Sequence, residues 1–330
     1  HGRQEIIDAI TKQLKTVDEI PDIAFVGYPP IEAAYIMSAW LKKKKVPFLI
    51  DIKDQWPNIL VESIPHPLKI FAKIFLAPYY LLAKKAMSNA TAISAHSLGF
   101  LNWSLSFSNR KGNSQDRVTP LTVSENQIPE EEIKEALRWW ADQGIEKKTG
   151  FRIIFVGSFS RAFDFDPIFK TAKLINSKQI DCEFILCGKG EKDKELRSKA
   201  EDHENVRIFS WIDLPKIRAL SGISDASIAP YKSTDDFVIS IPNKIIDSLM
   251  LGLPILSSLR GEVANLISNY DVGFTYSNSA DLFDYIISLS SDSELQKLTS
   301  HNAKNLYELE FKFDNVYDSL VSHLENIRRI

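Results

Sequence analysis

The stretch Pro242–Ser258, PNKIIDSLMLGLPILSS, joins a helix start, a helix stop and a buried strand. The Pro-Asn pair at its beginning is typical of a helix start, and apolar residues follow at helical spacing. Gly252 permits the left-handed conformation that ends many helices, and Pro254 prevents the helix from continuing. The apolar residues after Pro254 begin a strand. A helix followed directly by a buried strand is the repeating unit of a parallel α/β sheet.

Two charged residues share one face of the first turn of this expected helix. Lys244 and Asp247 are three positions apart, near the positive end of the helix dipole. Backbone N–H groups and a lysine suit a phosphate, and a carboxylate accepts hydrogen bonds from sugar hydroxyls. The stretch therefore predicts a site for a phosphorylated sugar compound. The alternative is that both residues are ordinary solvent-exposed members of the helix.

Length and composition exclude several classes of protein. A chain of 330 residues suits two α/β domains, and its net charge of −3 lacks the basic surplus of a nucleic-acid binder. Cys182 and Cys187 lie on opposite faces of one expected strand, which predicts buried, reduced thiols. No signal peptide opens the sequence, and no apolar run reaches the ~20 residues of a spanning helix. We therefore expect a cytoplasmic protein.

Strand and helix patterns alternate twice along the chain. We expect two domains, residues 1–148 and 149–330, joined by the connection 147–150. The polar stretch 106–117 predicts an exposed loop. The expected strands are 22–27, 47–52 and 90–94 in the first domain, and 151–156, 183–187, 206–209 and 226–229 in the second.

Residues 151–300 resemble the donor-binding domain of GT-B glycosyltransferases of family GT4. In that family the opening stretch reads roughly P-x-K-x-x-E, a few apolar residues and G-x-P. Here it reads P-N-K, then Asp247 and G-L-P. The resemblance implies an α/β protein of the GT-B fold, with two Rossmann-like doubly wound domains facing a cleft. It also implies that Asp247 replaces the glutamate that holds the donor ribose, while Ile239 stands where the family often has another glutamate.

The loop after the strand FRIIFV carries candidates for contact with the donor diphosphate. Gly157 and Ser158 let the backbone approach a ligand and donate to a phosphate. The resemblance implies that Arg161 contacts the diphosphate together with Lys244. A plain strand-to-helix turn with a solvated arginine is the alternative.

Three further positions match the donor side of the family. Gly188 begins a second glycine turn, which either faces the ligand or only shapes the turn. Trp211 occupies the position of the loop that binds the base. Glu262 begins another helix, where structural capping is favoured over contact with the sugar.

The first half carries the acceptor-side candidates. Asp54 in DIKDQWP matches an aspartate in a branch of GT4 that builds bacterial surface polysaccharides, and the resemblance implies that it faces the cleft. Tyr28 lies in a strand-end segment similar to the same branch. His96 follows a strand and either reaches the acceptor or is a surface histidine. A domain of this type normally opens with a strand and a glycine-rich loop, so we expect an N-terminal segment to be missing.

Residues 67–87 combine an apolar face and aromatic residues with four lysines. This composition fits a membrane interface, and the alternative is a core helix kinked at Pro78 with its lysines in water. Asp164 and Asp166 form a D-x-D pattern at an expected helix start, where we interpret them as caps rather than metal ligands.

The sequence thus predicts a retaining glycosyltransferase of surface polysaccharide or glycoconjugate biosynthesis. It would move a sugar from a UDP- or GDP-type donor to a lipid-linked or glycan acceptor, without cofactor or metal, in the cytoplasm or at the inner face of the plasma membrane. Catalysis would rest on Asp54, Arg161 and Lys244. The alternatives are a non-catalytic GT-B binding or scaffold subunit and a sugar-nucleotide epimerase.

Overall fold

The computed structural model describes residues 2–62, 64–125, 127–146 and 150–329 and forms two compact units. The first unit comprises His1–Pro120 with Asp314–Ile330, and the second comprises Leu121–Phe313. The division differs from the expected ranges in two places, because residues 121–148 belong to the second unit and the C-terminal helix to the first. Residues 147–149 of the expected connection lie outside the described part of the chain.

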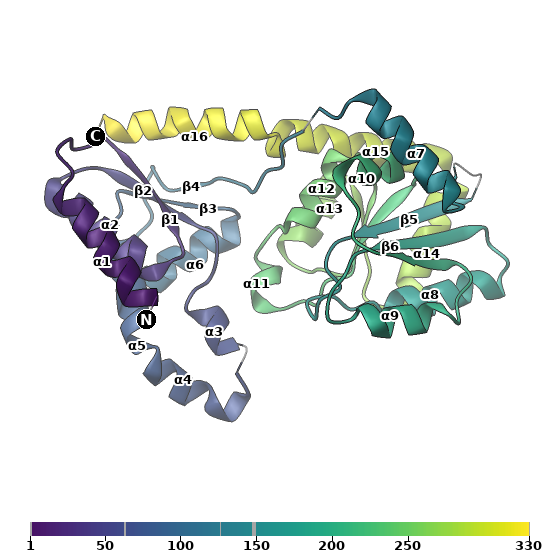
Figure 1. Cartoon of the computed structure of the whole chain (residues 1–330), viewed down its shortest axis with the longest axis horizontal. Helices are drawn as coiled ribbons and strands as arrows, with labels where there is room; N and C mark the ends of the chain where they lie inside the picture. Colours follow the sequence, from purple (N-terminus) through teal and green to yellow (C-terminus); the bar gives the residue numbers. More distant parts are fainter. Residues whose placement is uncertain (1, 63, 126, 147–149, 330) are drawn as a thin grey trace. The chain divides into compact units, whose positions relative to one another are not determined.

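The first unit contains a parallel sheet in the strand order β1-β2-β3-β4, which Figure 1 shows with helices around it. The strands are β1 (Ala24–Tyr28), β2 (Phe48–Ile52), β3 (Ala92–Ala95) and β4 (Arg117–Val118). The helices are α1 (Gly2–Lys15), α2 (Ile31–Lys44), α3 (Asn58–Glu62), the 3-10 helix η1 (His66–Leu68), α4 (Lys69–Phe75), α5 (Ala77–Asn89), α6 (Leu98–Ser108) and α16 (Phe313–Arg328).

Central strands of the first unit are covered on both faces. Every residue of β2 and β3 is buried, as their almost continuous apolar sequences require. Leu320 and Ile327 of α16 pack against Leu49 and Ala92, which explains why the C-terminal helix belongs to this unit. Helix α16 therefore supplies part of the first unit's core from the far end of the sequence.

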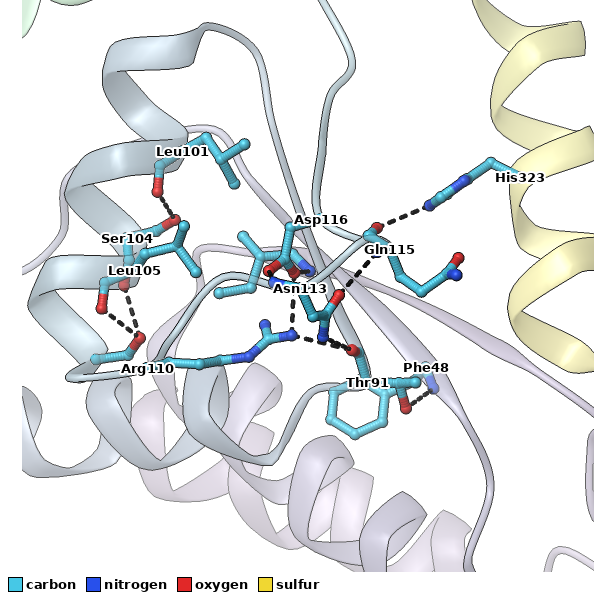
Figure 2. A network of polar contacts seen from close by, with 12 residues as sticks. Phe48, Thr91, Leu101, Ser104, Leu105, Arg110, Asn113, Gln115, Asp116 and His323 are labelled. Carbon is cyan, nitrogen blue, oxygen red and sulfur yellow. Dashed lines mark hydrogen bonds and ion pairs between the residues drawn. The ribbon is translucent and has the colours of Figure 1, made fainter. Parts of the chain in front are cut away.

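The polar stretch 106–117 is held by a network rather than left as a simple exposed loop (Figure 2). The Asp116 carboxylate accepts hydrogen bonds from the backbone N–H groups of Ile93 and Asn113, each at 2.7 Å, and pairs with Arg110 at 3.0 Å. The carbonyl of Gln115 lies 2.8 Å from a ring nitrogen of His323 on α16. These contacts position the residues that directly precede β4. This strand is not among those predicted from the sequence.

The second unit contains a parallel sheet in the order β10-β9-β8-β5-β6-β7. Its strands are β5 (Phe151–Val156), β6 (Cys182–Cys187), β7 (Val206–Phe209), β8 (Ala226–Ala229), β9 (Ile255–Ser257) and β10 (Gly273–Thr275). Its helices are α7 (Glu130–Asp142), α8 (Asp166–Ser177), α9 (Asp193–Ala200), α10 (Leu214–Ser221), α11 (Asp235–Val238), α12 (Asn243–Met250), α13 (Glu262–Tyr270), α14 (Ser279–Ser291), α15 (Ser293–Leu306) and the π-helix η2 (Tyr307–Phe311).

Helices cover both faces of this sheet, with α8 and α9 on one side and α7 and α10 on the other (Figure 1). Trp140 of α7 is fully buried, and its indole donates a 2.9 Å hydrogen bond to the carbonyl of Lys216 on α10. This packing explains why residues before 149 belong to the second unit. Cys182 and Cys187 are buried, form no disulfide bond within the described residues and belong to separate core clusters, as the sequence predicted.

The stretch that predicted a helix and a strand forms both. Helix α12 ends where Gly252 adopts a φ of +65°, in the left-handed region that favours glycine, and β9 follows. Residues 67–87 differ from the alternative to a membrane-interface segment, a core helix kinked at Pro78. They form the end of η1, then α4 and α5, and no residue of α4 is buried.

Candidate functional site

The strand order of the second unit reverses between β5 and β8, and an apolar cavity of about 180 Å³ lies beside these strands. Side chains of β5, β8, α10 and α12 line most of it. In open α/β sheets ligands bind near the carboxyl ends of the strands at such a reversal. The polar members of the lining are Ser124, Glu125, Arg218, Ser227, Lys244, Asp247 and Ser248.

Lys244 lies in the first turn of α12, and its side chain turns toward the end of β5. The ammonium group donates a hydrogen bond to the carbonyl of Val156 and lies 4.2 Å from the centre of the Phe155 ring. Burial lowers the pKa of Lys244 from 10.5 to about 8, and the Asp247 carboxylate opposes this change. The lysine therefore keeps its charge near neutral pH in a largely apolar setting.

Asp247 lines the same cavity one turn later on α12. Burial raises the pKa of its carboxyl group, and the Lys244 ammonium opposes the rise. The Ser248 hydroxyl donates a 2.8 Å hydrogen bond to the Lys244 carbonyl. Within the part of the chain that the structure describes, no side chain caps the N-terminus of α12 at Pro242. A cation, a carboxylate and uncapped backbone N–H groups thus lie together, an arrangement that can bind an anion linked to a hydroxylated group.

Glycines at the ends of β5 and β6 let two loops and the lysine pack closely. A Cβ atom on Gly157 would lie 2.5 Å from the Lys244 nitrogen, and one on Gly188 would lie 1.9 Å from the Gly157 carbonyl oxygen. The Gly157 N–H donates a 3.0 Å hydrogen bond to the carbonyl of Cys187. Gly188 therefore shapes the contact between the two loops, and Gly157 makes room for Lys244.

Arg161 follows in the same loop but is not part of the cavity lining. Its guanidinium pairs with the Glu191 carboxylate at 2.9 Å, and its side chain is 84% exposed. The backbone N–H of Arg161 donates a 2.7 Å hydrogen bond to the same carboxylate. Ser158 is exposed. The structure thus places these two residues in the expected loop, outside the cavity that holds Lys244.

Trp211 and Glu262 also lie outside the cavity. Trp211 follows β7, is 65% exposed and borders a hollow of about 220 Å³ together with Phe209 and Lys216. Glu262 is the first residue of α13. A capping box uses the third helical position, so Glu262 does not occupy the place that this motif requires.

Five polar residues of the cavity were not predicted from the sequence: Ser124, Glu125, Arg218, Ser227 and Ser248. The Ser227 hydroxyl in β8 is buried and has no hydrogen-bond partner among the described residues. A single serine in the otherwise apolar strand ASIA was a detectable signal. Glu125 lies on a loop and pairs with Lys304, and Arg218 lies on α10. The sequence alone does not distinguish either residue from an ordinary charged surface residue.

The acceptor-side candidates follow adjacent strands of the first unit. Tyr28 ends β1 and is paired in register with Ile52 of β2, which is paired with the last residue of β3. Asp54 comes two residues after β2, and His96 comes directly after β3. Carboxyl ends of neighbouring parallel strands share one edge of the sheet, so Tyr28, Asp54 and His96 gather at that edge.

Buried polar groups characterise this edge. The Tyr28 hydroxyl donates a 2.6 Å hydrogen bond to the Trp56 carbonyl. His96 is only 4% exposed and lies 4.0 Å, centre to centre, from the Phe100 ring, so the expectation of a surface histidine is wrong. Burial and the nearby Lys53 ammonium lower the pKa of His96 to about 4. The imidazole is therefore neutral at physiological pH.

The D-x-D pattern lies at the start of α8. The Asp164 carboxylate accepts a 3.1 Å hydrogen bond from the backbone N–H of Asp166, the first residue of α8, but the N-cap position itself is Phe165 and has no side-chain cap among the described residues. Asp166 pairs with Lys199 at 2.7 Å, and this bond lowers the pKa of its carboxyl group. Within the described ranges, no cluster of three or more histidine, cysteine or acidic side chains could hold a metal ion.

Comparison with known proteins follows the same division of the chain. Residues 150–292 match the family model of the group 1 glycosyl transferases. Compared by sequence, no curated protein matches the chain. The expected resemblance to this family is thereby confirmed for the second unit's sheet.

Solved structures resemble the chain along nearly its whole length. HepE of Anabaena, crystallised in complex with UDP, has a TM-score of 0.69 and 15% identity over 97% of this chain and 82% of its own. Sucrose-phosphate synthase of Thermosynechococcus elongatus has a TM-score of 0.67 and 11% identity over 98% and 79%. WaaG, a glycosyltransferase involved in lipopolysaccharide biosynthesis, has a TM-score of 0.60 and 12% identity over 96% and 94%. The likeness confirms a GT-B fold with two Rossmann-like units.

Proposed function

We infer from residues 150–292, which match the family model of the group 1 glycosyl transferases, that the protein is a glycosyltransferase using a nucleotide sugar. We propose that it moves a hexose-type sugar from a nucleotide-diphosphate donor to a lipid-linked or glycan acceptor, with retention of configuration. The place of this reaction would be the biosynthesis of a surface polysaccharide or glycoconjugate. The crystallised complex of HepE with UDP supports a UDP-type donor.

The placement of Lys244 and Asp247 in one cavity at the strand-order reversal carries the proposal. Lys244 and Arg161 would bind the diphosphate, which leaves with negative charge that cationic groups stabilise. Asp247 would accept hydrogen bonds from the ribose hydroxyls. The phosphates and the base of the donor would be contacted by three loops, which contain Gly157 with Ser158, Gly188, and Trp211. Glu262 would lie toward the sugar.

The first unit would supply the acceptor side. Tyr28 ends β1, and Asp54 and His96 follow the ends of the adjacent strands β2 and β3. The neutral His96 imidazole can exchange hydrogen bonds with hydroxyl groups. The Nδ1 atom of His96 is buried and has no partner among the described residues, so a bound hydroxyl could satisfy it. We assign Asp54 the role of orienting the acceptor hydroxyl.

Calorimetric titration with a panel of UDP- and GDP-sugars tests the proposed donor class. One donor should bind the intact protein, and Lys244→Ala should weaken it by ~1.5–3 kcal/mol, the range of a charge-assisted hydrogen bond. Lys170→Ala is the matched control, because this exposed lysine lies on α8 outside the cavity. Equal affinity in wild type, Lys244→Ala and Lys170→Ala would exclude the cavity as the donor site.

A second function, that of a non-catalytic binding subunit, is favoured by Ile239. This residue stands where the resembled family often has a glutamate near the donor sugar. Mass spectrometry of reaction mixtures separates the two functions. Donor binding without transfer to any lipid or glycan acceptor would support the subunit, and interconversion of the free donor without acceptor would indicate an epimerase.

The proposed reaction needs neither a cofactor nor a divalent metal, since cationic side chains and helix N-termini would bind the diphosphate. Turnover that is lost in EDTA and returns with Mg²⁺ or Mn²⁺ would contradict this part. None of the helices in the described ranges is long and apolar enough to cross a membrane. We nevertheless propose peripheral contact of residues 67–87 with the inner face of the plasma membrane, where a lipid-linked acceptor would be found.

A further inference from the structure

Helix α4 presents its large apolar side chains outward instead of toward the protein. Ile70, Phe71, Ile74 and Phe75 are between 68 and 82% exposed. The half-buried positions of the helix hold Lys69 and Ala72. An ordinary surface helix of a globular protein shows the reverse arrangement, with its apolar stripe facing the core.

The outward side chains form one continuous surface. Positions 70 and 74, 71 and 74, and 71 and 75 are neighbours on a helix because the members of each pair are three or four residues apart. Leu68 at the end of η1 and Leu81 on α5 are also exposed, at 53 and 62%. We call Leu68, Ile70, Phe71, Ile74, Phe75 and Leu81 the α4 apolar surface. Contiguous exposed apolar surface of this kind marks an interaction site, whereas scattered exposed residues do not.

Positive charge without negative charge accompanies this surface. No acidic residue occurs between residues 63 and 115, although the whole chain has a net charge of −3. Lys73, Lys84 and Lys85 are exposed, and Lys69 is half-buried. The ammonium of Lys84 lies 5.6 Å from the centre of the Phe107 ring. The lysines thus lie on the same helices as the exposed apolar side chains.

We propose that the α4 apolar surface inserts into the headgroup region of a bilayer that contains anionic phospholipids, with Lys69, Lys73, Lys84 and Lys85 binding the phosphate groups. This inference rests on the proposed function, which places the protein at a membrane that contains its lipid-linked acceptor, and it adds the class of lipid that the protein binds. Apolar and aromatic side chains beside lysines are the combination that holds a helix in the plane of an interface. Binding to the apolar groove of a protein partner would not require residues 63–115 to lack acidic side chains. An anionic lipid surface explains their absence, because it repels negative charge.

Vesicle sedimentation with the full chain tests the inserted residues. The protein should bind phosphatidylcholine vesicles that contain phosphatidylglycerol, and Phe71→Ser combined with Phe75→Ser should weaken binding at least about tenfold. Leu298→Ser combined with Leu309→Ser is the matched control, because both leucines are exposed in the second unit. Equal losses in the two double variants, or no binding by the wild type, would overturn the proposal.

The charge requirement is tested separately. Lys69→Gln combined with Lys73→Gln should weaken binding to anionic vesicles by about fivefold for each lysine. Lys170→Gln combined with Lys173→Gln, two exposed lysines of α8, should leave binding unchanged. Equal binding to vesicles with and without phosphatidylglycerol would overturn the anionic-lipid assignment. Self-association that depends on Phe71 and Phe75, without vesicle binding, would assign the surface to a second copy of the chain.

Nucleotide titration of the same variants separates this inference from the proposed function. Because no residue of α4 is buried, the melting temperature and UDP-sugar affinity of the phenylalanine variant should equal those of the wild type. Vesicle binding without affinity for any nucleotide sugar would overturn the proposed function and leave the lipid surface. Nucleotide-sugar binding without vesicle binding would overturn the lipid surface and leave the proposed function.

Discussion

The ammonium nitrogen of Lys244 lies 4.2 Å from the centre of the Phe155 ring and fills the space beside Gly157. The ring stabilises the cation by its π face, and the Val156 carbonyl accepts a hydrogen bond from it. A side chain at Gly157 and the lysine therefore cannot share this space. The glycine at the end of β5 and the lysine of α12 form one unit, although they are far apart in the sequence.

Gly157→Ala should displace the Lys244 side chain, because the added Cβ would lie 2.5 Å from its nitrogen. We expect nucleotide-sugar affinity to fall about tenfold, within the range of a lost charge-assisted hydrogen bond. Calorimetry of the single and double variants measures this effect. If Gly157→Ala weakens binding equally in wild type and in Lys244→Ala, the glycine acts on the ligand directly and not through the lysine.

Donor affinity should fall as pH rises through about 8, because burial lowers the pKa of Lys244 to that value and a diphosphate favours the ammonium form. Above this pH the affinity should fall by about tenfold per pH unit, until the pH reaches the higher pKa that the lysine has in the complex. Titration with a UDP-sugar between pH 6.5 and 9.5 measures the dependence. Lys244→Met should show a flat profile, and a flat wild-type profile would contradict the prediction.

The same lowered pKa has a consequence for stability. The unfolded chain holds the Lys244 proton up to the ordinary pKa of 10.5, whereas the folded chain releases it near 8. The unfolded state therefore binds more protons between these values, and this residue makes the free energy of unfolding rise with pH across that window. At pH 7, Lys244→Met should increase the free energy of unfolding by ~1–3 kcal/mol, because it removes a desolvated charge.

The exposed pair of Arg161 and Glu191 predicts a competition. Binding of a diphosphate by Arg161 would break its 2.9 Å contact with Glu191. Glu191→Gln keeps an acceptor for the Arg161 backbone N–H but frees the guanidinium, so donor affinity should rise by ~0.3–1 kcal/mol, the worth of an exposed ion pair. Calorimetry of Glu191→Gln in wild type and in Arg161→Ala checks this. A similar gain in both backgrounds would show that Arg161 does not bind the donor.

Elements were predictable where local sequence decides them. The strands Phe151–Val156, Val206–Phe209 and Ala226–Ala229 have the bounds that the apolar patterns indicate. The helix stop at Gly252 was predictable because few other residues adopt its φ of +65°. Periodicity and turn chemistry act within a few residues, so one sequence reveals them.

Features that depend on distant contacts were not predictable. The exposed apolar face of α4 has the same periodicity as a buried face, so pattern alone could not distinguish them. His96 looked like a surface histidine because its burial depends on Phe100 and on the strands beside it. Arg218 joins the cavity of Lys244 only because α10 and α12, which are separate in the sequence, both line it. Burial and shared cavities are properties of the fold and not of local spacing.

Asp116→Asn should lower the free energy of unfolding by ~2–4 kcal/mol. The carboxylate accepts two backbone hydrogen bonds of 2.7 Å and pairs with Arg110, and its side chain is 3% exposed. An amide keeps one acceptor oxygen and leaves Arg110 without its charged partner, although the Thr91 carbonyl still accepts a hydrogen bond from it, and such a loss is costly in a buried site. Urea unfolding measures the loss, with the exposed Asp18→Asn as control. A change as small as that of the control would show that the network in Figure 2 contributes little.

Asp247→Asn should weaken donor binding by removing one of the two oxygens that accept hydrogen bonds from the ribose. Asp247 lies one turn after Lys244 on α12 and lines the same cavity, so a diphosphate held at the lysine places its ribose near this carboxylate. The side chain is one methylene shorter than a glutamate, and either a closer helix or a bridging water would span the difference.

The measurement requires a choice of pH and a matched ligand. Asp247 raises the pKa of Lys244, so its replacement by asparagine lowers that pKa further, and titration near pH 6.5 keeps the lysine charged in both proteins. Deoxygenating the ribose should then cost the wild type more affinity than it costs Asp247→Asn, by ~1–2 kcal/mol. Asp247→Glu should retain the wild-type difference, because the carboxylate remains. Equal losses for the deoxy donor in wild type and Asp247→Asn would show that the ribose binds elsewhere.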